Sequence, residues 1–207
     1  GVYISEEDGL GLRPNVGLRG TGSLRMEKLN IMEDGILIAP APYASPAAYY
    51  SPTAGRMETI EIRKGSTQIK HGPFTTGGSL NYISTSIPMK QHNSVSLDTG
   101  SFGKTVLHAT SGNTEGKFGY LVELFTDNTD GFKELDGGGD TGYSKTDFMT
   151  KLRYSFSESH ALEFKYSMTD EISNETYLGL TDSDYKDNPL RRYRATTLDE
   201  MDADHSQ

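Results

Sequence analysis

The 207-residue sequence predicts a β-rich protein, with a small α+β domain in residues 1–88 and long antiparallel strands in 89–207. In the first half, short apolar runs are separated by Gly and Pro turns. In the second half, apolar and polar residues alternate with a period of two, which is typical of strands with one apolar face. No apolar run approaches the ~20 residues of a transmembrane helix.

Composition excludes several classes of function. The chain has no Cys, so it has neither disulfides nor a thiolate metal site. Its net charge of -9 argues against nucleic-acid binding, which normally requires a basic face. The five histidines lack the close spacing of a metal site, and there is no nucleophile-elbow or P-loop motif. We therefore expect no enzyme activity, no bound metal and no cofactor.

The first half contains several short elements. A strand is expected over residues 16–19, and Asp34-Gly35 between two apolar runs predicts a hairpin, because a type I′ turn needs two positive φ angles. Four prolines in 39–52 exclude a central strand there and predict a loop, with a helical turn near Ala47-Ala48. Residues 56–84 predict a strand, a Gly turn, a short helical turn, a Gly-rich turn and a second strand.

The second half predicts five strands, near residues 92–99, 104–111, 118–124, 148–156 and 162–169. Sustained alternation of this kind is typical of transmembrane β-strands. A soluble β-sandwich alternates in the same way, and the pattern alone does not separate the two.

The predicted connections differ in length on the two rims. The second and fourth links, near 112–117 and 156–160, are short. The third link, 127–142, and the segment after 173 are long and polar, whereas the first link is the turn at 100–103. Outer-membrane barrels have long extracellular loops and short periplasmic turns, so this sorting favours the membrane interpretation.

Four segments of the first half, taken in order, resemble the plug domain of TonB-dependent outer-membrane receptors. They are LRGT at 18–21, MEDG at 32–35, PTAGRMETIEIRKG at 52–65 and HGPFTTGGSLNYIS at 71–84. The APAPY run at 39–43 places the resemblance closest to the ferric-citrate and siderophore receptors.

The resemblance implies a fold and a function. Residues 1–88 are expected to be an N-terminally truncated plug, and 89–207 the first about five strands of a C-terminally truncated transmembrane β-barrel with its extracellular loops. The function implied is active import of a ferric chelate, ferric citrate or another siderophore, across the outer membrane of a Gram-negative bacterium. The implied partners are a TonB-type inner-membrane transducer, reached through a missing N-terminal segment, and outer-membrane lipid and lipopolysaccharide. No nucleic-acid partner is expected.

The resemblance also implies a salt-bridge lock between plug and barrel. Arg19 matches the plug arginine of that lock, and Lys64 stands where the family has a second arginine. A lysine is a point charge without the bidentate fork of arginine, which puts the second half of the lock in question.

Candidate ligand-binding residues lie in two loops and beside one strand. Tyr43, Tyr49 and Tyr50 offer hydroxyls and flat apolar faces, although packing against a barrel wall explains them equally well. Arg25 lies near a second expected plug apex, where an exposed loop arginine is the simpler explanation. Arg191, Arg192 and Arg194 form a cationic run suited to an anionic chelate.

Two alternatives to this anion site compete with it. One is contact with lipopolysaccharide phosphate, and the other is pairing with nearby acids, namely Asp182, Asp184, Asp187 and Asp199. Two other functions also stay open: a passive or signalling-only outer-membrane channel, and a soluble β-sheet adhesin or lectin-like binding module.

Overall fold

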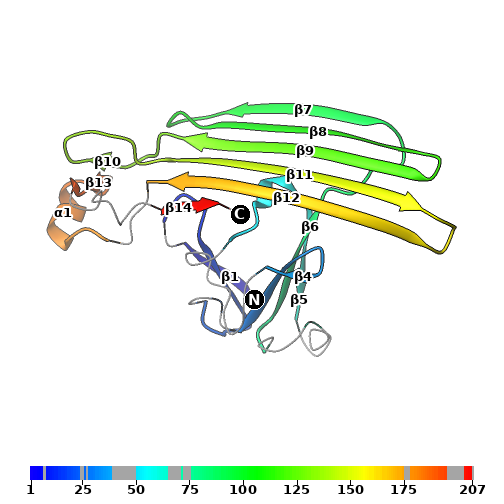
Figure 1. The fold of residues 1–207 in the computed structure, drawn as a ribbon. Helices are drawn as coiled ribbons and strands as arrows, with labels where there is room; N and C mark the ends of the chain where they lie inside the picture. The colour runs from blue at the N-terminus through cyan, green and yellow to red at the C-terminus, as the bar shows by residue number, and fades with distance from the viewer. Residues whose placement is uncertain are drawn as a thin grey trace. The chain divides into compact units, whose positions relative to one another are not determined.

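The computed structural model describes residues 1–6, 8–23, 26, 28–38, 50–64, 71, 76–174, 178–194 and 203–206 (Figure 1). The chain divides into two compact units, Gly1–Thr85 and Ser86–Gln207. The predicted division after residue 88 lies close to this boundary. None of the described helices is long and apolar enough to cross a membrane.

Unit 1 contains a four-stranded sheet of order β4-β3-β6-β5 and a separate antiparallel pair, β1-β2. β3 and β6 run parallel, whereas the other pairs in the sheet are antiparallel. The elements are β1 (Val2–Glu6), β2 (Pro14–Leu18), β3 (Leu29–Glu33), β4 (Ile36–Leu37), the 3-10 turn η2 (Ala54–Arg56), β5 (Met57–Arg63) and β6 (Gly78–Ser84).

Among the described residues of unit 1, the apolar core is small and centres on β2, β3 and β6. Its buried members are Val16, Leu18, Met26, Leu29, Ile31, Leu80 and Tyr82. The edge strand β5 contributes little, because Ile60 and Ile62 are 43% and 42% exposed. With so few buried side chains, polar contacts take a larger part in holding this unit together.

The Asp34-Gly35 hairpin is confirmed. Asp34 has φ 51° and Gly35 has φ 82°, as a type I′ turn requires. The Asp34 carboxylate accepts hydrogen bonds from the Ser84 amide at 2.9 Å and the Ser84 hydroxyl at 2.5 Å, which ties the turn to the end of β6.

The strand expected over 16–19 begins earlier, at Pro14, and ends at Leu18. It stops there because Arg19 adopts φ 56°, outside the β region. The helical turn expected near Ala47-Ala48 lies outside the described residues. So does the turn expected between Gly65 and Gly72, of which only His71 is described.

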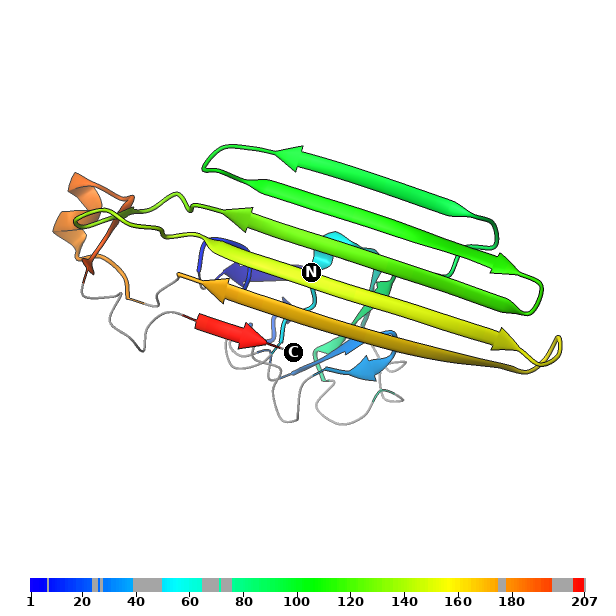
Figure 2. The ribbon, with the colours of Figure 1, turned by 45° about the horizontal axis from the view of Figure 1, so that its top comes forward.

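Unit 2 is built on a six-stranded antiparallel sheet of order β14-β12-β11-β9-β8-β7 (Figure 2). The strands are β7 (His92–Thr99), β8 (Thr105–Glu115), β9 (Phe118–Thr129), β11 (Tyr143–Ser155), β12 (Ala161–Ser173) and β14 (Ala203–Ser206). The five predicted strands are confirmed in up-and-down order, and four of them are longer than expected. β14 is an additional strand that pairs with the end of β12.

One face of this sheet is an exposed apolar band. Side chains from β9, β11 and β12 line up in cross-strand rows on that face. The rows are Phe118 with Tyr154 and Leu162, Tyr120 with Leu152 and Phe164, and Leu124 with Phe148 and Met168. Leu162 and Phe164 are 63% and 57% exposed, so the band is not covered by other parts of the described chain.

The opposite face carries ion pairs beside a few buried apolar side chains, Leu121, Phe125 and Met149. Lys145 on β11 bonds Glu171 on β12 at 2.9 Å, and His108 on β8 lies 2.8 Å from Glu123 on β9. Because side chains alternate, the same strands carry both faces.

The strand connections differ in length at the two ends of the sheet: long links lie at one end and short turns at the other. The short turn at 100–103 is the exception, because it lies at the end with the long links. The β8–β9 turn is only Gly116-Lys117, and the β11–β12 link covers 156–160. The β9–β11 link and the segment after β12 are long, and they contain β10 (Glu134–Leu135), α1 (Asp182–Asp187) and β13 (Arg191–Arg192).

Candidate functional site

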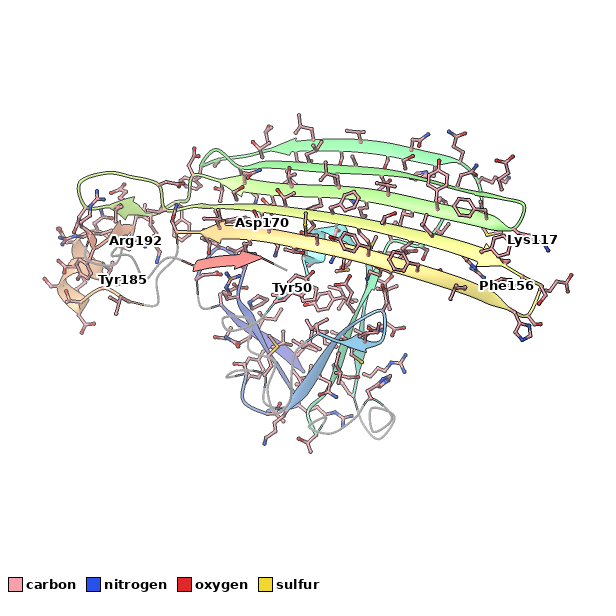
Figure 3. The ribbon with its side chains drawn as sticks, viewed as in Figure 1. Tyr50, Lys117, Phe156, Asp170, Tyr185 and Arg192 are labelled. Atoms are coloured by element: carbon pink, nitrogen blue, oxygen red, sulfur yellow. The ribbon has the colours of Figure 1, made fainter. Side chains whose placement is uncertain are left out.

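The two long connections of unit 2 join into one cluster beyond the outer ends of the strands. β10 pairs with β13 in parallel, although 55 residues separate Asp136 from Arg191 in the chain. The Glu134 amide donates to the Leu190 carbonyl at 2.7 Å, and the Asp136 amide donates to the Arg192 carbonyl at 2.9 Å. Figure 3 shows Tyr185 and Arg192 in this cluster, with Lys117 and Phe156 at the opposite end of the long strands.

Arg191 is the centre of the cluster. Its guanidinium forks onto Asp136, with Nε 2.8 Å from Oδ1 and Nη2 3.0 Å from Oδ2. A third bond joins Nη1 to Asp184 Oδ1 at 2.9 Å, and the guanidinium lies 5.1 Å from the centroid of the Tyr193 ring. This brace, Arg191 with Asp136 and Asp184, links the β9–β11 link to the segment after β12.

The other two arginines of the run also bond to the loops. Arg192 is 2% exposed and donates to the Asn174 carbonyl. Arg194 donates through Nε to the Asp136 carbonyl at 2.8 Å, and through Nη2 to the Gly138 carbonyl. The structure therefore brings together the three arginines predicted from the sequence, and it gives each of them partners within the chain.

The helix α1 positions the acidic part of the brace. Thr181 is its N-cap and accepts a bond from the Asp184 amide at 3.2 Å. The Tyr193 hydroxyl donates to Asp184 and accepts from the Thr181 amide at 3.1 Å, so it ties the helix start to the end of β13. A Thr followed three residues later by an acid is a recognisable helix-start signal, which would have predicted α1.

The bonds of the brace shift the pKa of its members. Hydrogen bonding from Arg191 lowers the pKa of Asp136, and hydrogen bonds from Tyr193 and Thr181 lower that of Asp184. Hydrogen bonding to Asp136 raises the pKa of Arg191. All three groups are charged at neutral pH, so the brace is fully ionic there.

Unit 1 contains a second polar cluster, built around a buried ion pair. Arg56, at the end of η2 and 2% exposed, forks onto Glu33 at the end of β3 with all three contacts at 3.1 Å. Arg56 Nη2 also donates to the Tyr50 hydroxyl at 2.8 Å, and that hydroxyl lies 3.5 Å from Glu33 Oε2. Tyr50, predicted as a ligand contact, thus bonds to this pair.

The remaining predicted site residues are placed separately. Arg19 follows β2 and Lys64 follows β5, and both side chains are exposed. Arg25, Tyr43 and Tyr49 lie outside the described residues. Within the described ranges, no three His, Asp or Glu side chains are arranged to hold a metal ion.

Glu33→Gln should destabilise unit 1 strongly, because it removes the carboxylate charge onto which the buried Arg56 guanidinium forks. We expect a loss of about 3–5 kcal/mol. Tyr50→Phe should cost only about 1 kcal/mol, the value of one hydrogen bond. Native-state hydrogen exchange of the β3 amides measures both. A double change, Glu33→Leu with Arg56→Leu, is the control and should cost less than Glu33→Gln alone.

Acid should release the brace. Folding lowers the pKa of Asp136 and Asp184, so their charged forms stabilise the cluster at every pH above their unfolded values of about 4. That stability is lost as the pH falls further, through the folded pKa values. Exchange protection of the Asp136 amide, corrected for intrinsic rate, should hold from about pH 7 to 5 and fall below about pH 4. An Asp136→Asn variant should show a weaker dependence, and a flat wild-type profile down to about pH 2.5 would contradict the assignment.

The fold is shared with solved outer-membrane receptors. No family model matches the chain. The pyoverdine outer-membrane receptor FpvA of Pseudomonas aeruginosa superposes with a TM-score of 0.67 at 18% identity, over 83% of this chain and 24% of that one. The siderophore receptor PirA of Acinetobacter baumannii superposes with a TM-score of 0.61 at 18% identity, over 86% of this chain and 29% of that one. The copper transporter OprC superposes with a TM-score of 0.61 at 20% identity, over 84% of this chain and 27% of that one.

The chain thus spans about a quarter of the length of these structures. The described part of the chain has the fold of the TonB-dependent outer-membrane receptors.

Proposed function

We propose that the protein is an outer-membrane receptor of a Gram-negative bacterium that imports a metal chelate. In this proposal unit 1 is the plug, and unit 2 supplies the first strands of the transmembrane barrel and two of its extracellular loops. The chelate is a ferric siderophore or ferric citrate, and import is driven by a TonB-type inner-membrane transducer. No chemical reaction is part of the proposal.

The exposed apolar band is the observation that carries the membrane assignment. A soluble sandwich would pack a second sheet over rows such as Phe118, Tyr154 and Leu162, whereas these three side chains are exposed. The polar face behind them suits a barrel interior. The connection lengths also support a barrel, since the longest links lie together at one end of the strands and short turns lie at the other. The adhesin or lectin-like alternative is not favoured.

The make-up of unit 1 supports its role as a movable plug. Its core is small, and buried polar contacts such as the Arg56–Glu33 pair hold its elements together. A body with few buried apolar contacts opens at lower cost than one with a large core. A transducer could then displace it without breaking the barrel.

The ligand is proposed to bind at the outer rim. The residues proposed to belong to this site are those predicted from the sequence, namely Arg25, Tyr43, Tyr49, Tyr50, Arg191, Arg192 and Arg194. Arg19 and Lys64 are proposed to lock the plug to barrel acids. Lipopolysaccharide phosphate is a further proposed partner of the outer rim.

Uptake by the full-length gene product tests the function. Cells that express it should accumulate radioactive iron from ferric citrate or a ferric siderophore, and deletion of the transducer should abolish accumulation. Accumulation that persists without the transducer would instead identify a passive channel. Absence of uptake for every chelate, with the protein correctly inserted, would contradict the proposal.

A charge on the apolar band should impair membrane insertion. Phe164→Arg places a cation on the lipid-facing side, at a cost of about 2–4 kcal/mol near the bilayer midplane. We expect less heat-modifiable protein in the outer-membrane fraction. Ser167→Arg, on the opposite face of the same strand, is the matched control and should insert normally. Equal insertion of both variants would show that the band does not face lipid.

A further inference from the structure

A pocket of about 320 Å³ lies within the loop cluster of unit 2, beside the brace. It is formed by the β9–β11 link on one side and by α1 and β13 on the other. Its lining includes Lys133, Leu178, Tyr185, Arg191, Arg192 and Tyr193.

The pocket combines an apolar, aromatic wall with a cationic one. Tyr185 and Leu178 are 62% and 53% exposed, so their apolar surfaces are open to a ligand in the pocket. Tyr193 adds a second ring. Flat aromatic and aliphatic walls favour a flat ligand with an apolar face.

The cationic side supplies a partner for an anion. Arg191 is committed to Asp136 and Asp184, so its charge is largely balanced. Lys133 differs, because it forms no ion pair with any described residue. Its ammonium lies 6.0 Å from the centroid of the Phe132 ring, a contact that leaves its charge unbalanced. Asp182 also lines the pocket from α1, so an anionic group is expected nearer to Lys133 than to the helix.

The volume limits the size of the ligand. Small-molecule sites span about 300–1,000 Å³, and a cavity of about 150 Å³ already holds a benzene ring. The pocket therefore suits one substituted ring and not a whole chelate. Citrate is small enough, but it has no apolar face to place against Tyr185 and Leu178.

We infer that this pocket binds an aromatic anion, a single ring bearing a carboxylate or a phenolate. The identity of the ring rests on the proposed function: if the protein imports a chelate, the ring is an aryl group of that chelate. Arg191 acts as a positioning residue, since it holds β10 against β13 and so keeps the two walls together. Lys133 and Tyr185 make the contacts.

Direct binding of 5-fluorosalicylate to the detergent-solubilised full-length protein tests the inference. Fluorine NMR should show broadening of the probe signal by the wild type. Lys133→Ala and Tyr185→Ala should each weaken binding about three- to tenfold, the range expected for one cation or one aromatic contact. Tyr185→Phe keeps the ring and should bind as the wild type does. Lys186→Ala removes a lysine of α1 that does not line the pocket, and it should also have no effect.

Arg191→Ala adds a readout that separates positioning from contact. It should weaken binding and also reduce exchange protection of the Asp136 amide, whereas Lys133→Ala should weaken binding with that protection intact. Equal probe affinity in the wild type, Lys133→Ala and Tyr185→Ala would overturn the inference. Displacement of the probe by citrate as readily as by unlabelled salicylate would overturn it too.

The inference and the proposed function fail in different ways. Transducer-dependent uptake of iron chelates by a protein that does not bind the probe would refute the pocket and leave the receptor function standing. Probe binding that responds to Lys133→Ala and Tyr185→Ala, in a protein without any uptake, would support the pocket and refute import.

Discussion

The in-register pairing of the long strands in unit 2 is the constraint on which the other features depend. Each of β8, β9, β11 and β12 must satisfy its backbone hydrogen bonds with its neighbours while sending successive side chains to opposite faces. A shift of one residue between two strands would mix the apolar rows with the charged ones. The same register fixes where the strands end, and therefore which connections meet at each rim.

Much of this could be predicted from the sequence because the determinants are local. Period-two alternation predicted the long strands, and the Asp34-Gly35 pair predicted the hairpin between β3 and β4. Strand ends were less accurate: β9 was expected to end at 124 but continues to Thr129, through the polar residues 126–129, because its pairing with β11 continues there. Strand alternation did not separate a membrane barrel from a sandwich; the family resemblance and the sorting of link lengths did, and the exposed band agrees with that choice.

The candidate site was harder to predict, because it depends on contacts between distant residues. The Arg191–Asp136 pair and the two-residue pairing of β10 with β13 have no local signal. From the sequence, the arginine run was interpreted as a ligand site in competition with pairing to nearby acids. Asp184 was among the acids considered, and it does bond to Arg191. Asp136, in the long polar link at 127–142, was not among them, so the second partner of Arg191 was missed.

The brace between the two outer connections has a consequence for how such proteins diversify. Because β10 belongs to one connection and β13 to the other, neither can change its length or course independently at the crossing point. Transplanting only one of them into a related scaffold would leave Asp136 without its arginine, or Arg191 with Asp184 as its remaining partner in the brace. Recombination that alters what the surface recognises would thus have to exchange both segments as a matched cassette.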